Sequence, residues 1–163
     1  MSDAAPAPEP IAARTLVLER ILDATPDKVF AAWTTPELLL KWFTPKPYET
    51  VKVDQDLRPG GRANITMRSP EGVEMPNPGI YLEIVPNKKL VFTDAMLEGW
   101  EPVGGMPFMV ATITFEDAPG GKTKYTATAK HFSIASTKQH EAMGFHAGWG
   151  AAADQLNELV KTL

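Results

Sequence analysis

Several kinds of residue are scarce or missing from this chain, and each absence excludes a class of protein. There is no cysteine, which excludes disulfides, thiolate nucleophiles and zinc–thiolate sites. Lys and Arg number 16 against 20 Asp and Glu, so the net charge is -4. That charge gives no electrostatic reason to bind nucleic acid or anionic lipid. No apolar run approaches the roughly 20 residues of a membrane-spanning helix, and we expect no membrane insertion.

The start of the chain differs in composition from the rest. The first ten residues, MSDAAPAPEP, are rich in Ala and Pro and have neither the basic flank nor the apolar core of a secretory signal. We therefore expect a disordered tail over residues 1–13 and a cytoplasmic protein. Residues 14–163 have the length of one domain, without internal repeats.

The middle of the chain has the patterns of two short helices and a sheet. Residues 14–24 are dense in branched apolar residues and predict a strand. Thr-Pro pairs at 25–26 and 35–36 predict two short helices in tandem, with each Thr as the cap. Between residues 48 and 132, apolar and polar residues alternate, which predicts about six antiparallel strands with one face covered.

The element expected to cover that face is a long helix over about residues 137–163. At 100° per residue, its apolar residues form one stripe: Ala142, Phe145, Trp149, Ala153, Leu156, Val160 and Leu163. Trp149 is at the centre of the stripe, so we expect it to be largely buried. The predicted fold is α+β, with a curved antiparallel sheet of about seven strands wrapped around this helix.

Several segments resemble one known family: VFAAWTTPELLLKWFTP, DLRPGGRANITMRSPEG, GIYLEIVPNKKLVFTDA, VATITFEDAPGGKTKYTA and GFHAGWGAAADQL. They are similar to the bacterial branch related to the C-terminal domain of the activator of heat-shock protein 90 ATPase, within the START-like (SRPBCC) superfamily. The resemblance covers residues 14–163. It implies a helix-grip fold with an elongated apolar cavity between the sheet and the long helix, and no shared catalytic residues.

Two common kinds of site do not fit the sequence. The spacing HEAMGFH differs from the H-E-x-x-H zinc pattern, so we expect no metal. The Gly-rich stretches RPGGR and APGGK each join two strands and do not open a helix, so we interpret them as turns and not as phosphate-binding loops. No cofactor is expected.

Some polar residues share a face with apolar ones and need a partner or a wet cavity. They are Arg20, Asp94, His131 and His146. One interpretation is structural: an ion pair of the Arg20–Asp94 type, or positions at sheet ends. The other is that Asp94, His131 and His146 line a pocket, where they orient a ligand or act as acid and base. His140 falls on the opposite side of the helix from Trp149, so we expect His146, and not His140, to respond to a ligand.

A ligand cavity between sheet and helix is expected to include residues from strands, loops and helix: Met67, Tyr81, Phe92, Asp94, Trp100, Met109, Tyr125, His131, Phe145, His146, Gly148 and Trp149. Gly148 is predicted to line the cavity and Gly150 to pack closely. The aromatic loops 42–48 and 97–108 either pack over an edge of the core or form a lid.

Three functions agree with these features. The leading hypothesis is a binding module for a small hydrophobic or aromatic molecule. The alternatives are an enzyme of the cyclase or aromatase type, with His131, His146 or Asp94 in proton transfer, and a chaperone-associated interaction domain. A homodimer and a chaperone partner are left open.

Overall fold

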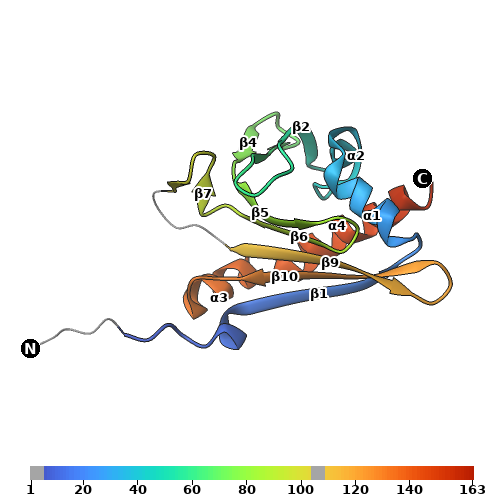
Figure 1. The fold of residues 1–163 in the computed structure, drawn as a ribbon. Helices are drawn as coiled ribbons and strands as arrows, with labels where there is room; N and C mark the ends of the chain where they lie inside the picture. The colour runs from blue at the N-terminus through green and yellow to red at the C-terminus, as the bar shows by residue number, and fades with distance from the viewer. Residues whose placement is uncertain (1–5, 104–108) are drawn as a thin grey trace, which may run out of the picture.

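The computed structural model describes residues 6–103 and 109–163, in which helices pack against antiparallel sheets (Figure 1). The helical elements are η1 (Ile11–Arg14), α1 (Pro26–Thr34), α2 (Pro36–Trp42), α3 (Ile134–Ala142) and α4 (Phe145–Val160). The strands are β1 (Thr15–Leu22), β2 (Glu49–Gln55), β3 (Ala63–Arg68), β4 (Glu74–Asn77), β5 (Ile80–Val85), β6 (Lys89–Thr93), β7 (Met96–Leu97), β8 (Glu101–Pro102), β9 (Val110–Ala118) and β10 (Lys122–Lys130).

The strands form a five-stranded sheet of order β1-β10-β9-β6-β5, a three-stranded sheet β2-β3-β4 and a small β7-β8 hairpin. The two larger sheets join where the β2–β3 turn meets β5. There the Gly60 amide donates to the Tyr81 carbonyl at 2.7 Å, and the Tyr81 amide donates to the Gly61 carbonyl at 3.0 Å. The α+β helix-grip prediction is confirmed, although the expected single sheet of about seven strands is divided into two.

The core lies between the five-stranded sheet and α4. Alternate residues of β10 face the helix and are buried, among them Tyr125, Ala127 and Ala129. From α4 the residues Phe145, Ala153, Leu156 and Val160 are buried against them. The predicted stripe is correct over this stretch, whereas its outer members Ala142 and Leu163 are exposed.

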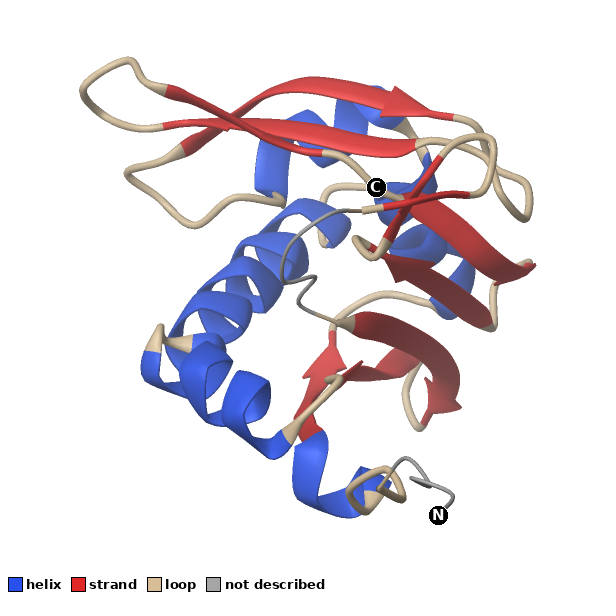
Figure 2. Ribbon diagram, turned by 90° about the vertical axis from the view of Figure 1, so that its left-hand side faces the viewer, coloured by secondary structure: helices blue, strands red, loops and turns tan. Residues whose placement is uncertain are grey.

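The prediction of one continuous C-terminal helix is wrong. The segment is two helices, which Figure 2 shows as blue segments set at an angle and joined by a short turn. Gly144 between them has φ +98°, a left-handed conformation that favours glycine. The glycine therefore ends α3 and starts α4 in a new direction, and the Gly148 amide donates to the Gly144 carbonyl at 2.7 Å to begin α4.

Part of the expected disordered tail has regular structure. Ile11–Arg14 form a 3-10 helix. Glu9 also contacts the body of the protein, because its carboxylate Oε1 accepts a hydrogen bond from the Ile134 amide at 3.2 Å. Residues 1–5, for which disorder was also predicted, lie outside the described residues, and the division into tail and single domain stays a prediction.

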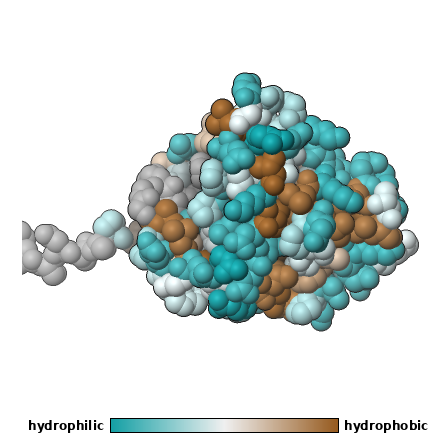
Figure 3. Space-filling model, turned by 90° about the horizontal axis from the view of Figure 1, so that it is seen from above, coloured by the Kyte–Doolittle hydropathy of each residue, from teal (hydrophilic) through white to brown (hydrophobic). Residues whose placement is uncertain are grey.

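No helix in the described ranges has both the length and the apolar character needed to cross a bilayer. On the face seen in Figure 3, apolar side chains are interspersed with hydrophilic ones. The exposed large apolar residues include Val17 and Ile21 of β1.

Candidate functional site

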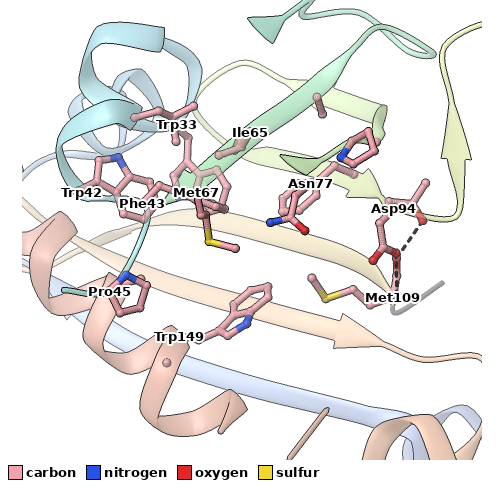
Figure 4. A pocket seen from close by; sticks show the side chains of 18 of the residues that line it. Trp33, Trp42, Phe43, Pro45, Ile65, Met67, Asn77, Asp94, Met109 and Trp149 are labelled. Atoms are coloured by element: carbon pink, nitrogen blue, oxygen red, sulfur yellow. Dashed lines mark hydrogen bonds between the residues drawn. The ribbon is translucent and has the colours of Figure 1, made fainter. Parts of the chain in front are cut away.

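A pocket of about 340 Å³ lies between α4, the α1–α2 pair and the two sheets. Figure 4 shows its labelled walls: Trp33, Trp42, Phe43 and Pro45 at one end, Asp94 and Met109 at the other, and Trp149 of α4 facing Ile65, Met67 and Asn77. The remaining residues that line it are Leu39, Ala63, Pro78, Gly79, Tyr81, Phe92, Thr93, Tyr125, His140, Gly148 and Ala152.

The first end of the pocket is aromatic. The Trp33 ring packs edge-on against Trp42 and Phe43, with ring centroids 5.0 and 5.7 Å apart. Two contacts fix the neighbouring chain: the Trp42 indole donates to the Ala32 carbonyl at 2.9 Å, and the Gln155 side chain of α4 donates to the Trp42 carbonyl at 2.8 Å. The two short helices thus present a rigid aromatic wall.

These helices start at the predicted places, after Thr25 and Thr35, with Pro at the first position. The predicted side-chain caps are wrong, because neither threonine side chain caps its helix. The Thr25 hydroxyl donates instead to the Asp27 carboxylate.

Exposure is graded across the pocket lining. Leu39, Trp42 and Tyr125 are buried, Trp149 is half-buried, and Asn77 is exposed. The pocket therefore opens between α4 and the β3–β4 pair and closes against α1, α2 and the five-stranded sheet.

The second end of the pocket carries its polar groups. Asp94 follows β6, and its Oδ1 accepts a hydrogen bond from the Met109 amide at 3.1 Å. The Thr93 hydroxyl donates to the Met109 carbonyl at 2.9 Å. Two consecutive side chains, Thr93 at the end of β6 and Asp94 directly after it, therefore hold both backbone groups of Met109, so the strand end and the carboxylate have a defined position.

His140 of α3 belongs to the same end and is paired with His131. His131 Nε2 lies 2.8 Å from His140 Nδ1, and His131 Nδ1 lies 3.1 Å from the Arg14 carbonyl. Because a carbonyl only accepts, His131 Nδ1 carries the proton and its Nε2 is the acceptor in the neutral ring. His140 Nδ1 is then the donor, which assigns the tautomer of both rings.

Burial affects the ionisation of three groups in the lining. It raises the pKa of Tyr81 to about 12, despite the hydrogen bond from Gln55, and it raises the pKa of Tyr125 further. Burial lowers the pKa of His140; the electrostatic effect that a protonated His131 would exert acts in the same direction, and the Asp94 carboxylate opposes it. At neutral pH these three side chains are therefore uncharged.

The sequence of the chain matches one family model, described as Activator of Hsp90 ATPase homolog 1-like protein, over residues 23–161. The chain belongs to this family. The resemblance noted in the sequence is thereby confirmed, and with it the START-like superfamily.

Solved structures of bacterial proteins agree with the membership in this Activator of Hsp90 ATPase homolog 1-like family. A crystal structure of a Nitrosomonas europaea protein is 42% identical, covers 93% of this chain and 96% of its own, and has a TM-score of 0.87. A Mycobacterium smegmatis protein, 24% identical with 92% of each chain covered and a TM-score of 0.77, shares the fold. So does an Arthrobacter aurescens protein, 22% identical over 95% of this chain and 90% of its own, with a TM-score of 0.80. No curated protein matches the sequence significantly.

The structure brings together eight of the residues predicted for the cavity: Met67, Tyr81, Phe92, Asp94, Met109, Tyr125, Gly148 and Trp149. Four others lie elsewhere: Trp100, His131, Phe145 and His146. Phe145 is buried in the core, His131 is buried behind His140, and His146 is exposed beside Glu141. A role in ligand binding stays a prediction for all twelve.

The positions of His140 and His146 are the reverse of the expectation. His140 lines the pocket, and His146 Nε2 lies 3.0 Å from the Glu141 carboxylate on the surface. The prediction counted 100° per residue along one continuous helix, and the left-handed Gly144 breaks that count between His140 and Trp149. His146 lies in α4 together with Trp149, on an exposed side of that helix.

Two further expectations are corrected. Arg20 and Asp94 do not pair: Arg20 lies 4.0 Å from Asp154 of α4, and Asp94 accepts from Met109. Trp149 is half-buried and not fully buried, because one side of the indole borders the pocket while the other packs on Phe145, with ring centroids 4.9 Å apart.

The two aromatic loops have different positions. In the loop 42–48, Trp42, Phe43 and Pro45 line the pocket, so this loop contains residues that the cavity prediction missed. In the loop 97–108, residues 104–108 lie outside the described residues. Trp100 in that loop is 61% exposed, and its indole covers Gly60. Among the described residues, no group of three His, Asp or Glu side chains could hold a metal ion.

Proposed function

We propose that this protein binds a small, mostly apolar molecule in the pocket between α4 and the sheets. The observation that carries the proposal is a pocket of about 340 Å³ whose wall is aromatic at one end and polar at the other. Ligand sites in proteins are typically concave, lined by apolar and aromatic side chains, and equipped with a few polar groups that orient the ligand. This pocket has each of those properties.

Gly148 supports the proposal because it keeps the pocket mouth open. A Cβ added at Gly148 would meet nothing within 4 Å, although a glycine inside a helix costs about 1 kcal/mol relative to alanine. The helix therefore carries a destabilising residue at a place where a side chain would enter the pocket.

The test is a titration with N-phenyl-1-naphthylamine, an uncharged probe whose fluorescence increases in apolar surroundings. Wild type should bind it, and Gly148→Leu should weaken binding at least tenfold, since the leucine side chain would occupy the pocket. Ala147→Leu is the matched control, because Ala147 is the exposed neighbour on the same helix. Absence of binding to wild type, or equal binding by both variants, would contradict the proposal.

The alternatives from the sequence predict other outcomes. An acid–base enzyme is favoured by one observation, the hydrogen-bonded His131–His140 pair at the pocket wall. In that case His140→Asn should leave probe binding intact and abolish turnover of any substrate that the pocket accepts. A chaperone-associated module, by contrast, should keep its partner when Gly148→Leu blocks the pocket.

A further inference from the structure

Most polar side chains of the pocket lining already have hydrogen-bond partners in the protein. The Trp42 indole and the Thr93 hydroxyl each donate to a backbone carbonyl, and the Tyr81 hydroxyl accepts from a glutamine side chain. Asp94 and His140 are hydrogen-bonded as well. These bonds hold the walls of the pocket in place.

Two accessible side chains of the lining make no hydrogen bond within the described part of the chain: the indole N–H of Trp149 and the amide of Asn77. Figure 4 shows the two side chains projecting from opposite walls into the pocket. Trp149 belongs to α4 and Asn77 ends β4. Trp149 is half-buried and Asn77 is exposed, so both groups are open to a bound molecule.

Donors outnumber acceptors in this pair of groups. An indole N–H only donates, and a side-chain amide has two N–H donors and one carbonyl oxygen. A hydrocarbon that covered Trp149 would displace water from the indole N–H and leave this donor unpaired, which is unfavourable. A ligand with an acceptor atom would replace the water as a partner. The pocket therefore favours ligands that carry an acceptor.

The acceptor is expected to be uncharged. Neither Lys nor Arg is among the described lining residues, and the segment 104–108, Gly-Gly-Met-Pro-Phe, contains no ionisable side chain. A carboxylate would lose its hydration in the pocket without gaining an ion pair to a Lys or Arg of this lining, which is unfavourable. A carbonyl oxygen also accepts hydrogen bonds, but it carries no charge whose hydration would be lost.

We propose that the pocket selects uncharged ring compounds that carry a carbonyl oxygen: the ring system packs against the apolar walls, and the oxygen accepts hydrogen bonds from Trp149 Nε1 and Asn77 Nδ2. A carbonyl oxygen has two lone pairs, one for each donor. Trp149 and Asn77 are then the residues that determine specificity. This inference rests on the proposed function and adds to it the functional group that the ligand carries.

The compounds 9-fluorenone and fluorene test this inference, because both are flat, uncharged tricyclic molecules that differ by a carbonyl in place of a methylene group. Each competes with N-phenyl-1-naphthylamine for the wild-type protein. Fluorenone should bind at least about fivefold more tightly than fluorene, as expected for one or two neutral hydrogen bonds. Hydrophobicity alone would give the opposite order, since fluorene is the more apolar compound.

Two variants remove the donors and keep side chains of similar kind or size. Trp149→Phe retains an aromatic ring without the N–H, and Asn77→Leu retains the volume without the amide. Each should reduce the preference for fluorenone, and in the double variant the two compounds should bind within about twofold of each other.

Trp100→Phe and Thr66→Val are the matched controls, because neither Trp100 nor Thr66 lines the pocket. Trp100→Phe makes the same substitution at a tryptophan that is 61% exposed, and Thr66→Val removes a polar group from the neighbouring strand β3. Both should retain the preference of wild type. Circular dichroism verifies that each variant is folded.

A nuclear magnetic resonance measurement reports on the hydrogen bond itself. The chain has four tryptophans, so the ¹⁵N-labelled protein has four indole N–H signals, and Trp149→Phe identifies the one from Trp149. Fluorenone should move this proton signal downfield, as hydrogen bonding does, and fluorene should not. The signal of Trp100 should respond to neither compound.

The outcomes separate the two proposals. If fluorene binds as tightly as fluorenone, if the double variant keeps the preference, or if both compounds move the Trp149 signal equally, the inference is overturned and the binding function stands. If neither compound nor N-phenyl-1-naphthylamine binds, both proposals are overturned. Should the double variant fail to fold, the affinities and the indole signals of wild type decide alone.

Discussion

Replacing Gly148 by alanine should stabilise the protein. In the interior of α4, alanine is favoured over glycine by about 0.8–1.0 kcal/mol. The added Cβ would have no heavy atom within 4 Å beyond its own helix neighbours, so no clash reduces this gain. For a domain of this size, 1 kcal/mol corresponds to an increase of about 2–4 °C in melting temperature.

Two other glycines of the same stretch provide internal comparisons. At Gly150 the new Cβ would lie 3.0 Å from Arg20 Nη2, the end of a flexible side chain that is 42% exposed. The predicted close packing is thus against a group that can move, and Gly150→Ala should be within about 0.5 kcal/mol of neutral. Gly144 has φ +98° and open space around it, so Gly144→Ala should cost about 1–2 kcal/mol from the left-handed backbone alone.

The measurement is urea unfolding of the three variants, followed by circular dichroism and by tryptophan fluorescence. From most to least stable, the expected order is Gly148→Ala, then wild type together with Gly150→Ala, and then Gly144→Ala. Gly148→Ala could instead lower the free energy of unfolding by more than about 1 kcal/mol, the scale of overpacking in a filled core. In that case the space beside Gly148 would be filled, and Gly148 would not border an open pocket.

Other perturbations test the core, the pocket wall, the histidine pair and a helix cap. Phe145→Ala should lower the free energy of unfolding by about 3–5 kcal/mol, because Phe145 is 1% exposed. Trp149→Ala should lower it by less, because Trp149 is half-buried. If urea unfolding gave equal losses for the two variants, the position of the pocket beside Trp149 would be contradicted. Since burial lowers the pKa of His140 in the folded protein, the unfolded chain binds its proton first as the pH falls below about 6.5. The free energy of unfolding should therefore decrease between pH 7 and pH 5, and His140→Asn should flatten that decrease; an unchanged slope would refute the assignment. Ser133→Ala should cost about 1 kcal/mol, because the Ser133 hydroxyl caps α3 by accepting from the Ser136 amide at 3.0 Å, and a melting temperature equal to wild type would argue against the cap.

The elements themselves follow from local patterns in the chain. Strict alternation over β9 and β10 predicted strands whose covered residues are Ile113, Phe115, Tyr125 and Ala127, and these are buried. Each strand residue faces the side opposite to its neighbours, so the pattern alone was enough. The Pro residues that begin α1 and α2 likewise determine where the helices start.

The composition of the pocket wall was less predictable. Sequence reasoning found Met67, Tyr81 and Trp149, because they fall on expected inner faces. It missed Trp33 and Trp42 as lining residues, although Trp42 was counted among the aromatic residues of the loop 42–48. Which side of a short helix borders a cavity depends on its packing angle against α4 and the sheets, and no local pattern encodes that angle.

The sequence by itself determined the family, the fold class and the alternation of the strands, since these depend on local composition and on motifs spread along the chain. The tertiary structure decided which polar groups meet. His131 and His140 are paired, His146 is on the surface, and Asp94 is held by Met109 and not by Arg20. For His140 the physical reason is a single backbone conformation: the left-handed Gly144 redirects α3 relative to α4. Side-chain positions on either side of such a turn are set by three-dimensional packing and not by a helical repeat.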